Sequence, residues 1–479
     1  MPPAPPDRPN AAAFHYHTYR YPQDAVRGAF QLSDALASAG DARFYSLYRD
    51  LLGLVAWGNT QDVPNLRLTS MSTQTGGTQT VGGRETLVLS FGGPLPGPTA
   101  PVKPAVVLTG GIHAREWIAV EVAYLIAEYL IKNYTTAPQN RYQRMIRALV
   151  DNRRIYIIPM VNPDGNDYTV FTADGAGRLW RKNRRQLPGT PQGWVDLLTD
   201  NGNLGTDPPP FTNVHVAEEP PGAQYDVPIY QVPLGTPLAG SERYACGLPV
   251  DVIGIDLNRN LGTQAWGYDG LGYPPEPEDP PDPPEPPPPP QPGYSGFPSN
   301  SGYFGPAAGS EAETANLQIL MAQVYPRIAA SIDYHSRGKL ILFPSELSYN
   351  DGVGADYKMF GVALWSLVRG QGGADYLIGT PRELLDADAT GTVMDYAAQL
   401  HQSRAFTIEL DPALTVQNGW ILAEDQICGV FEKNIRGALA AIASPPGSAD
   451  TEHARYVYDL IVKVFTAWNV YGRGNRLPA

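Results

Sequence analysis

A chain of 479 residues with 43% hydrophobic and 17% charged residues can bury a large core, which excludes an intrinsically disordered protein. The formal net charge of −13 argues against nucleic acid or an anionic membrane surface as the main partner. No segment approaches about 18 uninterrupted apolar residues, so the sequence predicts no membrane-spanning helix.

The amino-terminal residues have neither the positive start nor the apolar core of a secretory signal. As written, the chain is therefore expected to be cytoplasmic, and secreted only if a leader is missing or a non-standard route is used. The two cysteines, Cys246 and Cys428, are far apart and fit no metal-binding spacing, so both are expected to be free thiols.

The first predicted segment is an irregular arm over residues 1–23, rich in Pro, His and Tyr. Apolar residues recur mostly at helical spacing from residue 24 to about 55, which predicts two short amphipathic helices. Residues 66–95 alternate between apolar and polar, with Gly and Thr clusters between the runs, and this pattern predicts strands joined by tight turns.

Nearly continuous apolar runs follow, and they predict strands that are covered on both faces. These strands are expected at residues 103–109, 154–161, 328–334, 340–343 and 405–410. Helical spacing is found at residues 116–134, 312–325, 357–369 and 420–442. The predicted fold class is therefore α/β, with a central mixed, largely parallel β-sheet flanked by helices on both faces.

Two insertions interrupt the single domain that we predict over residues 24–443. Residues 186–252 lack periodicity and are expected to form a surface excursion. Residues 274–292 contain 13 prolines and five acidic residues, which predicts an extended, solvated spacer. The same composition also suits a ligand for a proline-reading domain. Residues 444–479 form a tail with a helix-like run.

The first motif with chemical content is the pair His113 and Glu116, which follows one apolar run and precedes a helical one. On a turn between a strand and a helix, an imidazole and a carboxylate three residues apart can point at one position. Zinc accepts both donor types, and a catalytic zinc site needs a third protein ligand. Chance often supplies this short pattern, so the downstream motifs decide its meaning.

Five further motifs follow: Asn162-Pro163-Asp164-Gly165, Arg178-Leu179-Trp180-Arg181-Lys182-Asn183-Arg184, Asp256-Leu257-Asn258-Arg259-Asn260, Asp333-Tyr334-His335-Ser336 and Phe406-Thr407-Ile408-Glu409-Leu410. With these motifs in this order, the chain resembles the zinc metallocarboxypeptidases of the pancreatic carboxypeptidase type. The resemblance runs from about residue 106 to residue 443, interrupted by the two insertions.

The resemblance implies one Zn²⁺ per chain, bound by His113, Glu116 and His335. It also implies that Asp256 orients the His113 ring, as an outer carboxylate usually does for a ligating imidazole. Glu409 corresponds to the general base, which takes a proton from the attacking water and hands it to the leaving amine. Arg181 corresponds to the cation that stabilises the oxyanion.

By the same resemblance, four residues form the site for the terminal carboxylate of the substrate. Asn258 and Arg259 would hold the carboxylate, because the planar guanidinium can bind it through two parallel bonds. Arg115 and Arg178 would extend this cationic cleft.

One departure concerns a mobile tyrosine that the family usually carries before its last glutamate. The corresponding stretch, residues 384–391, contains no tyrosine, so the substrate carboxylate would lack that closing group. Met394 falls where the family sets side-chain preference, and it favours a neutral or hydrophobic terminal residue over a basic one. Three carboxylates, Glu346, Asp386 and Asp388, would favour a basic residue if they lie near the same pocket.

The predicted function is hydrolysis of the C-terminal peptide bond of peptides or proteins by zinc-activated water. A first alternative is a zinc amidase of the same fold that acts on cell-wall peptides or acylated amino acids. A second alternative, from another class, is a non-catalytic interaction protein that displays the proline-rich loop and has no need of Glu409.

Overall fold

The structure is a computed structural model. It describes residues 19–21, 44–93, 103–171, 180–185, 214–218, 223–227, 254–263, 302–324, 328–344, 376–385, 389–401, 403–411 and 426–443. Within these stretches, no helix has both the length and the apolar character needed to cross a membrane.

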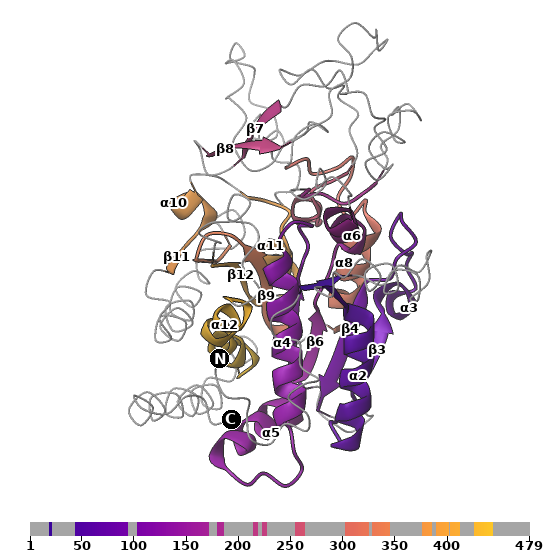
Figure 1. The fold of residues 1–479 in the computed structure, drawn as a ribbon, viewed down its shortest axis with the longest axis vertical. Helices are drawn as coiled ribbons and strands as arrows, with labels where there is room; N and C mark the ends of the chain where they lie inside the picture. Colours follow the sequence, from indigo (N-terminus) through magenta and orange to yellow (C-terminus); the bar gives the residue numbers. More distant parts are fainter. Residues whose placement is uncertain are drawn as a thin grey trace, which may run out of the picture.

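An eight-stranded mixed sheet lies at the centre, in the order β11-β10-β12-β9-β5-β6-β4-β3 (Figure 1). Its four central strands run parallel to one another, and they are β12 (Arg404–Leu410), β9 (Ile328–Ser336), β5 (Ala105–Gly110) and β6 (Arg154–Ile158). The sequence predicted a strand at each of these places.

Antiparallel strands flank this parallel centre on each side. On one side β4 (Leu87–Gly92) pairs with β6, and β3 (Arg67–Ser70) forms the edge. On the other side β10 (Leu340–Leu342) pairs with β12, and β11 (Leu377–Gly379) forms the edge. The sheet is therefore mixed and largely parallel, as predicted.

Helices cover both faces of the sheet, so successive residues of one strand enter different cores. In β5, Val106 and Leu108 pack in one core, whereas Ala105 and Val107 pack in the other. The first core includes α2 (Leu47–Thr60), α4 (Trp117–Asn133), α5 (Arg141–Asn152) and α12 (Ile427–Ala443). In Figure 1, α4 runs along the front of the sheet between α12 and α2.

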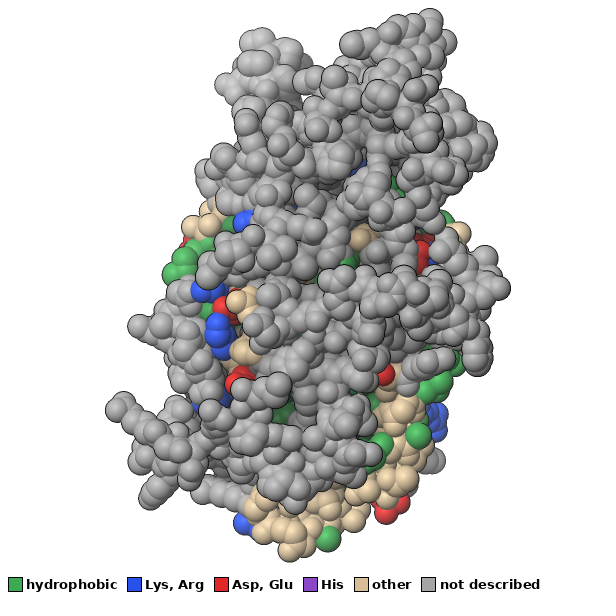
Figure 2. Space-filling view, viewed as in Figure 1, with side chains coloured by type: hydrophobic (Ala, Val, Ile, Leu, Met, Phe, Trp, Pro, Cys, Tyr) green, Lys and Arg blue, Asp and Glu red, His purple; other side chains and the backbone are tan. Residues whose placement is uncertain are grey.

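The second core is covered by α8 (Ala312–Val324) and α11 (Val393–His401), with α3 (Met71–Thr75) beside α8. On the face shown in Figure 2, the described hydrophobic side chains occur in small groups among polar and charged ones. The apolar residues of the described strands are buried against the helices of the two cores.

Shorter elements complete the described structure. They are α6 (Pro163–Phe171), α10 (Pro381–Leu385), the 3₁₀-helix η2 (Leu257–Arg259), and two two-stranded sheets formed by β1 (Tyr19–Tyr21) with β2 (Phe44–Ser46) and by β7 (Val214–Glu218) with β8 (Ala223–Val227).

Several local predictions were wrong. Residues 44–46 form a strand that pairs with β1 from the predicted irregular arm, and the helix after them extends to Thr60. A short helix, α3, interrupts the predicted strands of residues 66–95, because Ser70 caps it and Gly76 ends it in a left-handed conformation. The first insertion, residues 186–252, includes the antiparallel pair β7–β8, and its assignment as a surface excursion stays a prediction.

Helix α5 was not predicted, although its sequence carries the required signal. Met145, Ile146, Leu149 and Val150 share one buried face of the helix, and Asn140 caps its start. The helix predicted at residues 357–369, the proline-rich segment 274–292 and the tail 444–479 lie outside the described residues.

One buried acid on α8 stands out. Glu313 is 1% exposed, and both its carboxylate oxygens are buried without a well-aligned hydrogen-bond partner among the described residues. Burial raises the pKa of Glu313 to about 8, and the neighbouring carboxylate of Asp164 adds to this rise. A carboxyl group in this position is therefore protonated at neutral pH.

We expect Glu313→Gln to change how stability depends on pH. Between the ordinary pKa of 4.5 and the raised value of about 8, the folded protein keeps a proton that the unfolded chain has released. The free energy of unfolding of the wild type therefore falls as pH rises through this window, by at most about 1.4 kcal/mol per pH unit. The variant should lack this fall, and urea unfolding at several pH values measures it. Parallel profiles for the two proteins would contradict the assignment.

Candidate metal centre

The loop between β5 and α4 brings His113 and Glu116 to the edge of the sheet where the parallel strands end. Gly111 turns the chain directly after β5 with φ of 60°, a left-handed conformation that favours glycine. His335 is the penultimate residue of β9, which lies beside β5 and parallel to it. Because parallel strands end at one edge of a sheet, side chains 219 positions apart meet there.

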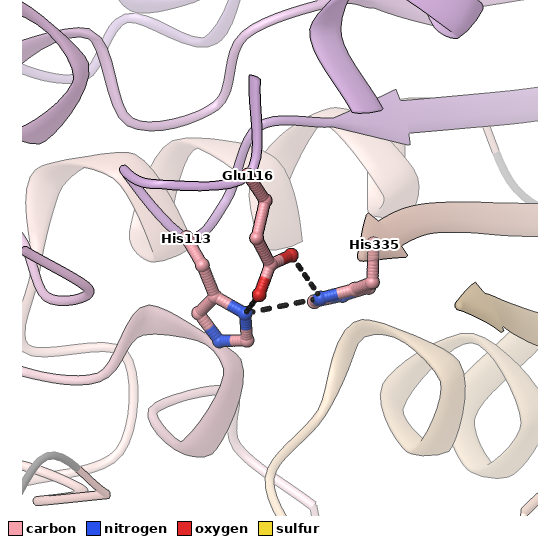
Figure 3. A group of neighbouring side chains, drawn as sticks. All are labelled: His113, Glu116 and His335. Carbon is pink, nitrogen blue, oxygen red and sulfur yellow. Dashed lines mark hydrogen bonds and ion pairs between the residues drawn. The ribbon is translucent and has the colours of Figure 1, made fainter. Parts of the chain in front are cut away.

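The three side chains point at one position (Figure 3). His113 Nδ1 lies 2.8 Å from Glu116 Oε1, and His335 Nδ1 lies 3.0 Å from Glu116 Oε2. The two Nδ1 atoms are 3.0 Å apart. One donor atom from each residue lies within 4.8 Å of the others, and no other such metal-binding group occurs among the described residues.

This donor set can hold a metal cation. His113, Glu116 and His335 are 3%, 2% and 1% exposed, so water does not solvate them. Although burial opposes ionisation, the two imidazoles hold the pKa of Glu116 well below its usual range. Two imidazole nitrogens and a carboxylate in a dry pocket are the ligands of a catalytic zinc, which takes three protein ligands and keeps a fourth position open.

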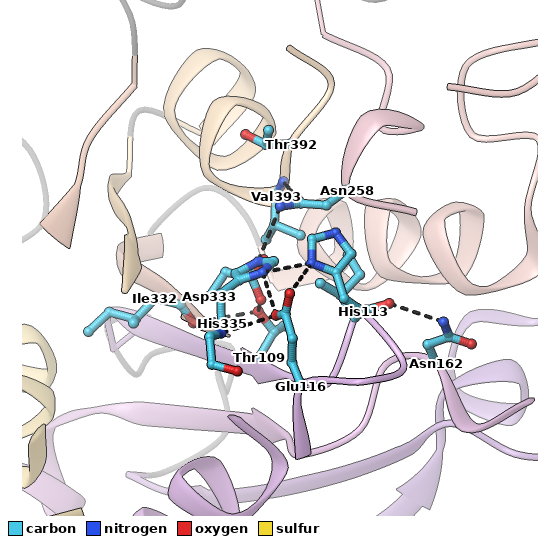
Figure 4. Close-up of polar contacts among 12 residues, drawn as sticks. Thr109, His113, Glu116, Asn162, Asn258, Ile332, Asp333, His335, Thr392 and Val393 are labelled. Carbon is cyan, nitrogen blue, oxygen red and sulfur yellow. Dashed lines mark hydrogen bonds and ion pairs between the residues drawn. The ribbon is translucent and has the colours of Figure 1, made fainter. Parts of the chain in front are cut away.

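Each imidazole also contacts a carboxylate through its other nitrogen. His113 Nε2 lies 3.1 Å from Asp256 Oδ1, and His335 Nε2 lies 2.7 Å from Asp333 Oδ2 (Figure 4). When Nε2–H donates to such a carboxylate, the lone pair of Nδ1 faces the common position. The sequence indicated Asp256 but not Asp333, whose position two residues before His335 on a strand was the available signal.

Asp256 also holds Arg181. The Nε and Nη2 atoms of Arg181 lie 3.0 and 2.9 Å from Asp256 Oδ2, and Nη1 lies 4.0 Å from Glu116 Oε1. Although burial opposes ionisation, Arg181 and His113 hold the pKa of Asp256 well below its usual value. One carboxylate therefore fixes both an imidazole of the metal-binding group and a cation beside it.

Backbone contacts tie the loop of His113 to the segment of Arg181. The Ala114 N–H donates to the Arg181 carbonyl oxygen. The Asn162 amide donates to the carbonyl oxygens of Ile112 and Lys182, at 3.1 Å each. Asn162 comes from the second sequence motif, and it acts here as a clamp between two loops.

Glu409 lies on β12, directly opposite His335 on β9. Its Oε2 atom is buried and has no hydrogen-bond partner among the described residues. Burial raises the pKa of Glu409 to about 7, with the nearby His335 opposing the rise and the Glu116 carboxylate adding to it. A carboxylate with this pKa can accept and return a proton near neutral pH.

The structure describes three of the four residues that were predicted to bind the substrate carboxylate. Asn258 and Arg259 belong to η2 and are buried at 4% and 7% exposure. Arg259 Nη1 donates to the Asn258 carbonyl oxygen at 2.8 Å. Arg115 follows His113 by two positions in the chain, and its side chain is buried. Arg178 lies outside the described residues.

The predicted determinants of side-chain preference are mostly not described. Met394 is buried on α11 and packs in the second core. Glu346, Asp386 and Asp388 lie outside the described residues. The preference for a neutral over a basic terminal residue therefore stays a prediction.

The zinc carboxypeptidase family model matches residues 67–437, which include the metal-binding group, Arg181, Asp256 and Glu409. The chain belongs to the zinc carboxypeptidase family. This membership confirms the resemblance found in the sequence motifs, and it names the metal that the donor set fits.

Individual relatives match over shorter stretches. The chain is 45% identical over 83 residues to a zinc carboxypeptidase of Saccharothrix mutabilis subsp. capreolus, which is 17% of each protein. It is 44% identical over 87 residues to an inactive metallocarboxypeptidase of Arthroderma gypseum, which is 18% of this chain and 13% of that protein. These matches span less than a fifth of either relative's length.

A solved structure supports the fold over a longer range. Carboxypeptidase A from Helicoverpa armigera superposes with a TM-score of 0.52 at 20% sequence identity, covering 84% of this chain and 72% of that one. At this identity the likeness concerns the fold alone, and it agrees with the α/β sheet described above.

We expect the purified protein to contain about one zinc ion per chain and His335→Ala to lose most of it, because two remaining ligands hold zinc weakly. Elemental analysis after dialysis measures the occupancy. His401→Ala is the matched control, since His401 is also buried but lies outside the three-residue group. Full occupancy in His335→Ala would remove this residue from the metal site.

Proposed function

We propose that this protein is a zinc-dependent metallocarboxypeptidase that hydrolyses the C-terminal peptide bond of peptides or proteins. The observation that carries the proposal is the buried, unpartnered Oε2 of Glu409 beside the group His113, Glu116 and His335. Family membership supports it but does not suffice, since one relative is named an inactive metallocarboxypeptidase.

In this proposal, each charged group has a separate task. Bound zinc would acidify a water in its open position and polarise the scissile carbonyl. Glu409 accepts the proton of the attacking water and then donates it to the leaving amine. Arg181 is held in place by Asp256, so its charge is oriented before the negative charge develops on the carbonyl oxygen.

A free terminal carboxylate is the substrate feature that the neighbouring cations suit. Arg259 is buried beside Asp256, whose pKa it helps to lower, and Arg115 is buried in the His113 loop. A guanidinium in a dry pocket binds a carboxylate strongly, because charge-assisted bonds are shorter and stronger than neutral ones. We therefore propose Arg259 as the main contact, assisted by Asn258, Arg115 and Arg178.

The zinc amidase remains a second candidate within the same fold. It would use the same zinc, Glu409 and Arg181, but it would not depend on a terminal carboxylate. The absence of a tyrosine from residues 384–391 favours the amidase, because a carboxypeptidase would have to hold the terminal carboxylate without that side chain. Substrates with a free or an amidated terminus separate the two candidates.

Residues 274–292 are proposed to act as a solvated spacer, since their many prolines prevent regular packing. A proline-reading partner is the alternative for this segment. A non-catalytic protein that displays this loop would not need Glu409, whereas the proposed enzyme needs Glu409 for turnover. This difference can be measured.

We expect Glu409→Gln to lower kcat by roughly 10²-fold or more while zinc stays bound, because the amide keeps the size of the side chain but cannot accept a proton. Turnover of blocked dipeptides and zinc content are measured on the same samples. Glu383→Gln, an exposed glutamate on α10, serves as the control. Unchanged turnover in Glu409→Gln would place the base elsewhere.

We expect Arg259→Ala to lower kcat/KM for substrates with a free carboxylate, because the carboxylate loses its buried partner. The expected loss of transition-state stabilisation is about 2–5 kcal/mol. The loss should vanish for amidated substrates, which the wild type should cleave poorly. Arg67→Ala, an exposed arginine on the edge strand β3, is the control. Equal cleavage of acid and amide, with Arg259→Ala harmless to both, would favour the amidase.

A further inference from the structure

Asp333 is a buried carboxylate that the proposed mechanism has not used. It lies two residues before His335 on β9, so both side chains point to the same side of the sheet. Thr109 on β5 is its cross-strand neighbour, and the Thr109 hydroxyl donates to Asp333 Oδ1 at 2.6 Å. The other oxygen, Oδ2, lies 2.7 Å from His335 Nε2. Asp333 is 1% exposed and therefore held in one orientation by the two strands.

A second group competes for the same imidazole nitrogen. The Nδ2 atom of Asn258 lies 3.1 Å from His335 Nε2 (Figure 4). The orientation of this amide is set on its other side, because Asn258 Oδ1 accepts the Val393 N–H at 3.0 Å. Asn258 therefore presents N–H donors to the ring, whereas Asp333 presents an acceptor.

The two neighbours favour opposite tautomers of His335. Asn258 would donate to an unprotonated Nε2, which leaves the proton on Nδ1, where the Glu116 carboxylate, 3.0 Å away, accepts it in the absence of a metal. Asp333 accepts a proton from Nε2–H, which leaves the Nδ1 lone pair directed at the other two donors. Only the second tautomer can bind a metal through Nδ1.

We propose that Asp333 is a positioning residue that selects the metal-binding tautomer of His335 against the competing amide of Asn258. The bond to Asp333 is the shorter of the two, and a carboxylate acceptor makes a stronger bond than a neutral amide donor does. Both neighbours are buried, so water does not weaken the competition.

This arrangement differs from the one at His113. Asp256 holds the His113 ring and Arg181 together, so its replacement disturbs a metal ligand and a catalytic cation at once. Asp333 contacts His335 and Thr109, and it therefore acts on the metal site through one ring. The inference rests on the proposed function only in taking the three donors as the zinc site.

The test compares zinc affinity in graded variants, measured by competition with a chromophoric chelator. Asp333→Asn keeps a neutral acceptor and should weaken zinc binding about 10-fold, whereas Asp333→Leu removes the acceptor and should weaken it about 100-fold. Ser331→Ala is the matched control, because Ser331 lies two residues earlier on β9, is equally buried, and its hydroxyl makes no hydrogen bond with the described residues. Its zinc affinity should equal that of the wild type.

A double variant separates tautomer selection from a merely structural role. Asn258→Leu removes the competing donor, so the pair Asp333→Leu with Asn258→Leu should bind zinc about 10-fold more tightly than Asp333→Leu alone. In the zinc-free proteins, ¹⁵N spectra of the histidine rings at alkaline pH should show the Nε2–H tautomer for His335 in the wild type. The same spectra should show the Nδ1–H tautomer in Asp333→Leu, and His335→Ala identifies the signal.

Two results would overturn the inference. One is wild-type zinc affinity in Asp333→Leu, and the other is an unchanged tautomer in that variant, with no recovery in the double variant. A wild type that binds no zinc would instead refute the proposed function, and the tautomer spectra would still decide the role of Asp333.

Discussion

The pairing of β5 with β9 is the constraint on which the candidate site depends. Thr109 lies opposite Asp333 and Gly110 opposite Tyr334, so the loop that begins at Gly111 and the end of β9 face each other. A one-residue shift in this register would turn His335 to the other side of the sheet and separate it from His113. Val106 and Leu108 pack in one core while Ala105 and Val107 pack in the other, so such a shift would also exchange the residues that fill the two cores. The packing of two cores thus determines where the metal-binding side chains meet.

Electrostatics in this buried edge follow from the same arrangement. Glu116, Asp256 and Asp333 are nearly inaccessible to water, and each would be costly to bury alone. Each contacts an imidazole, and Asp256 contacts Arg181 as well. Glu409 is the exception, since its Oε2 lacks a hydrogen bond within the described structure and its pKa is raised to about 7 by burial. The group without a partner is therefore the one suited to exchange protons with a substrate, whereas the paired groups are suited to hold the geometry.

Much of the sheet and the metal-binding group was predictable, because both depend on patterns that the sequence carries directly. Continuous apolar runs marked the four central strands, and polar motifs at their ends marked His113, Glu116, His335 and Glu409. The strand at residues 44–46 was missed because its partner, β1, comes from a separate segment that was predicted to be irregular, and pairing between separate segments leaves no local pattern. Asp333 was missed for a similar reason. Its meaning depends on Thr109 and Asn258, which are remote in sequence and adjacent only in the folded chain.

The shared carboxylate at Asp256 affects how variants of this site should be interpreted. Because one side chain contacts His113 through Oδ1 and Arg181 through Oδ2, its loss would disturb both the metal-binding group and the cation that we propose for oxyanion stabilisation. The effects of changing His113, Arg181 and Asp256 are therefore not expected to add, since all three side chains belong to one network centred on Asp256. Asp333, in contrast, contacts His335 and is anchored by Thr109 across the strands. A change at Asp333 is consequently expected to act on the metal-binding group through His335, whereas a change at Asp256 is expected to act on both His113 and Arg181.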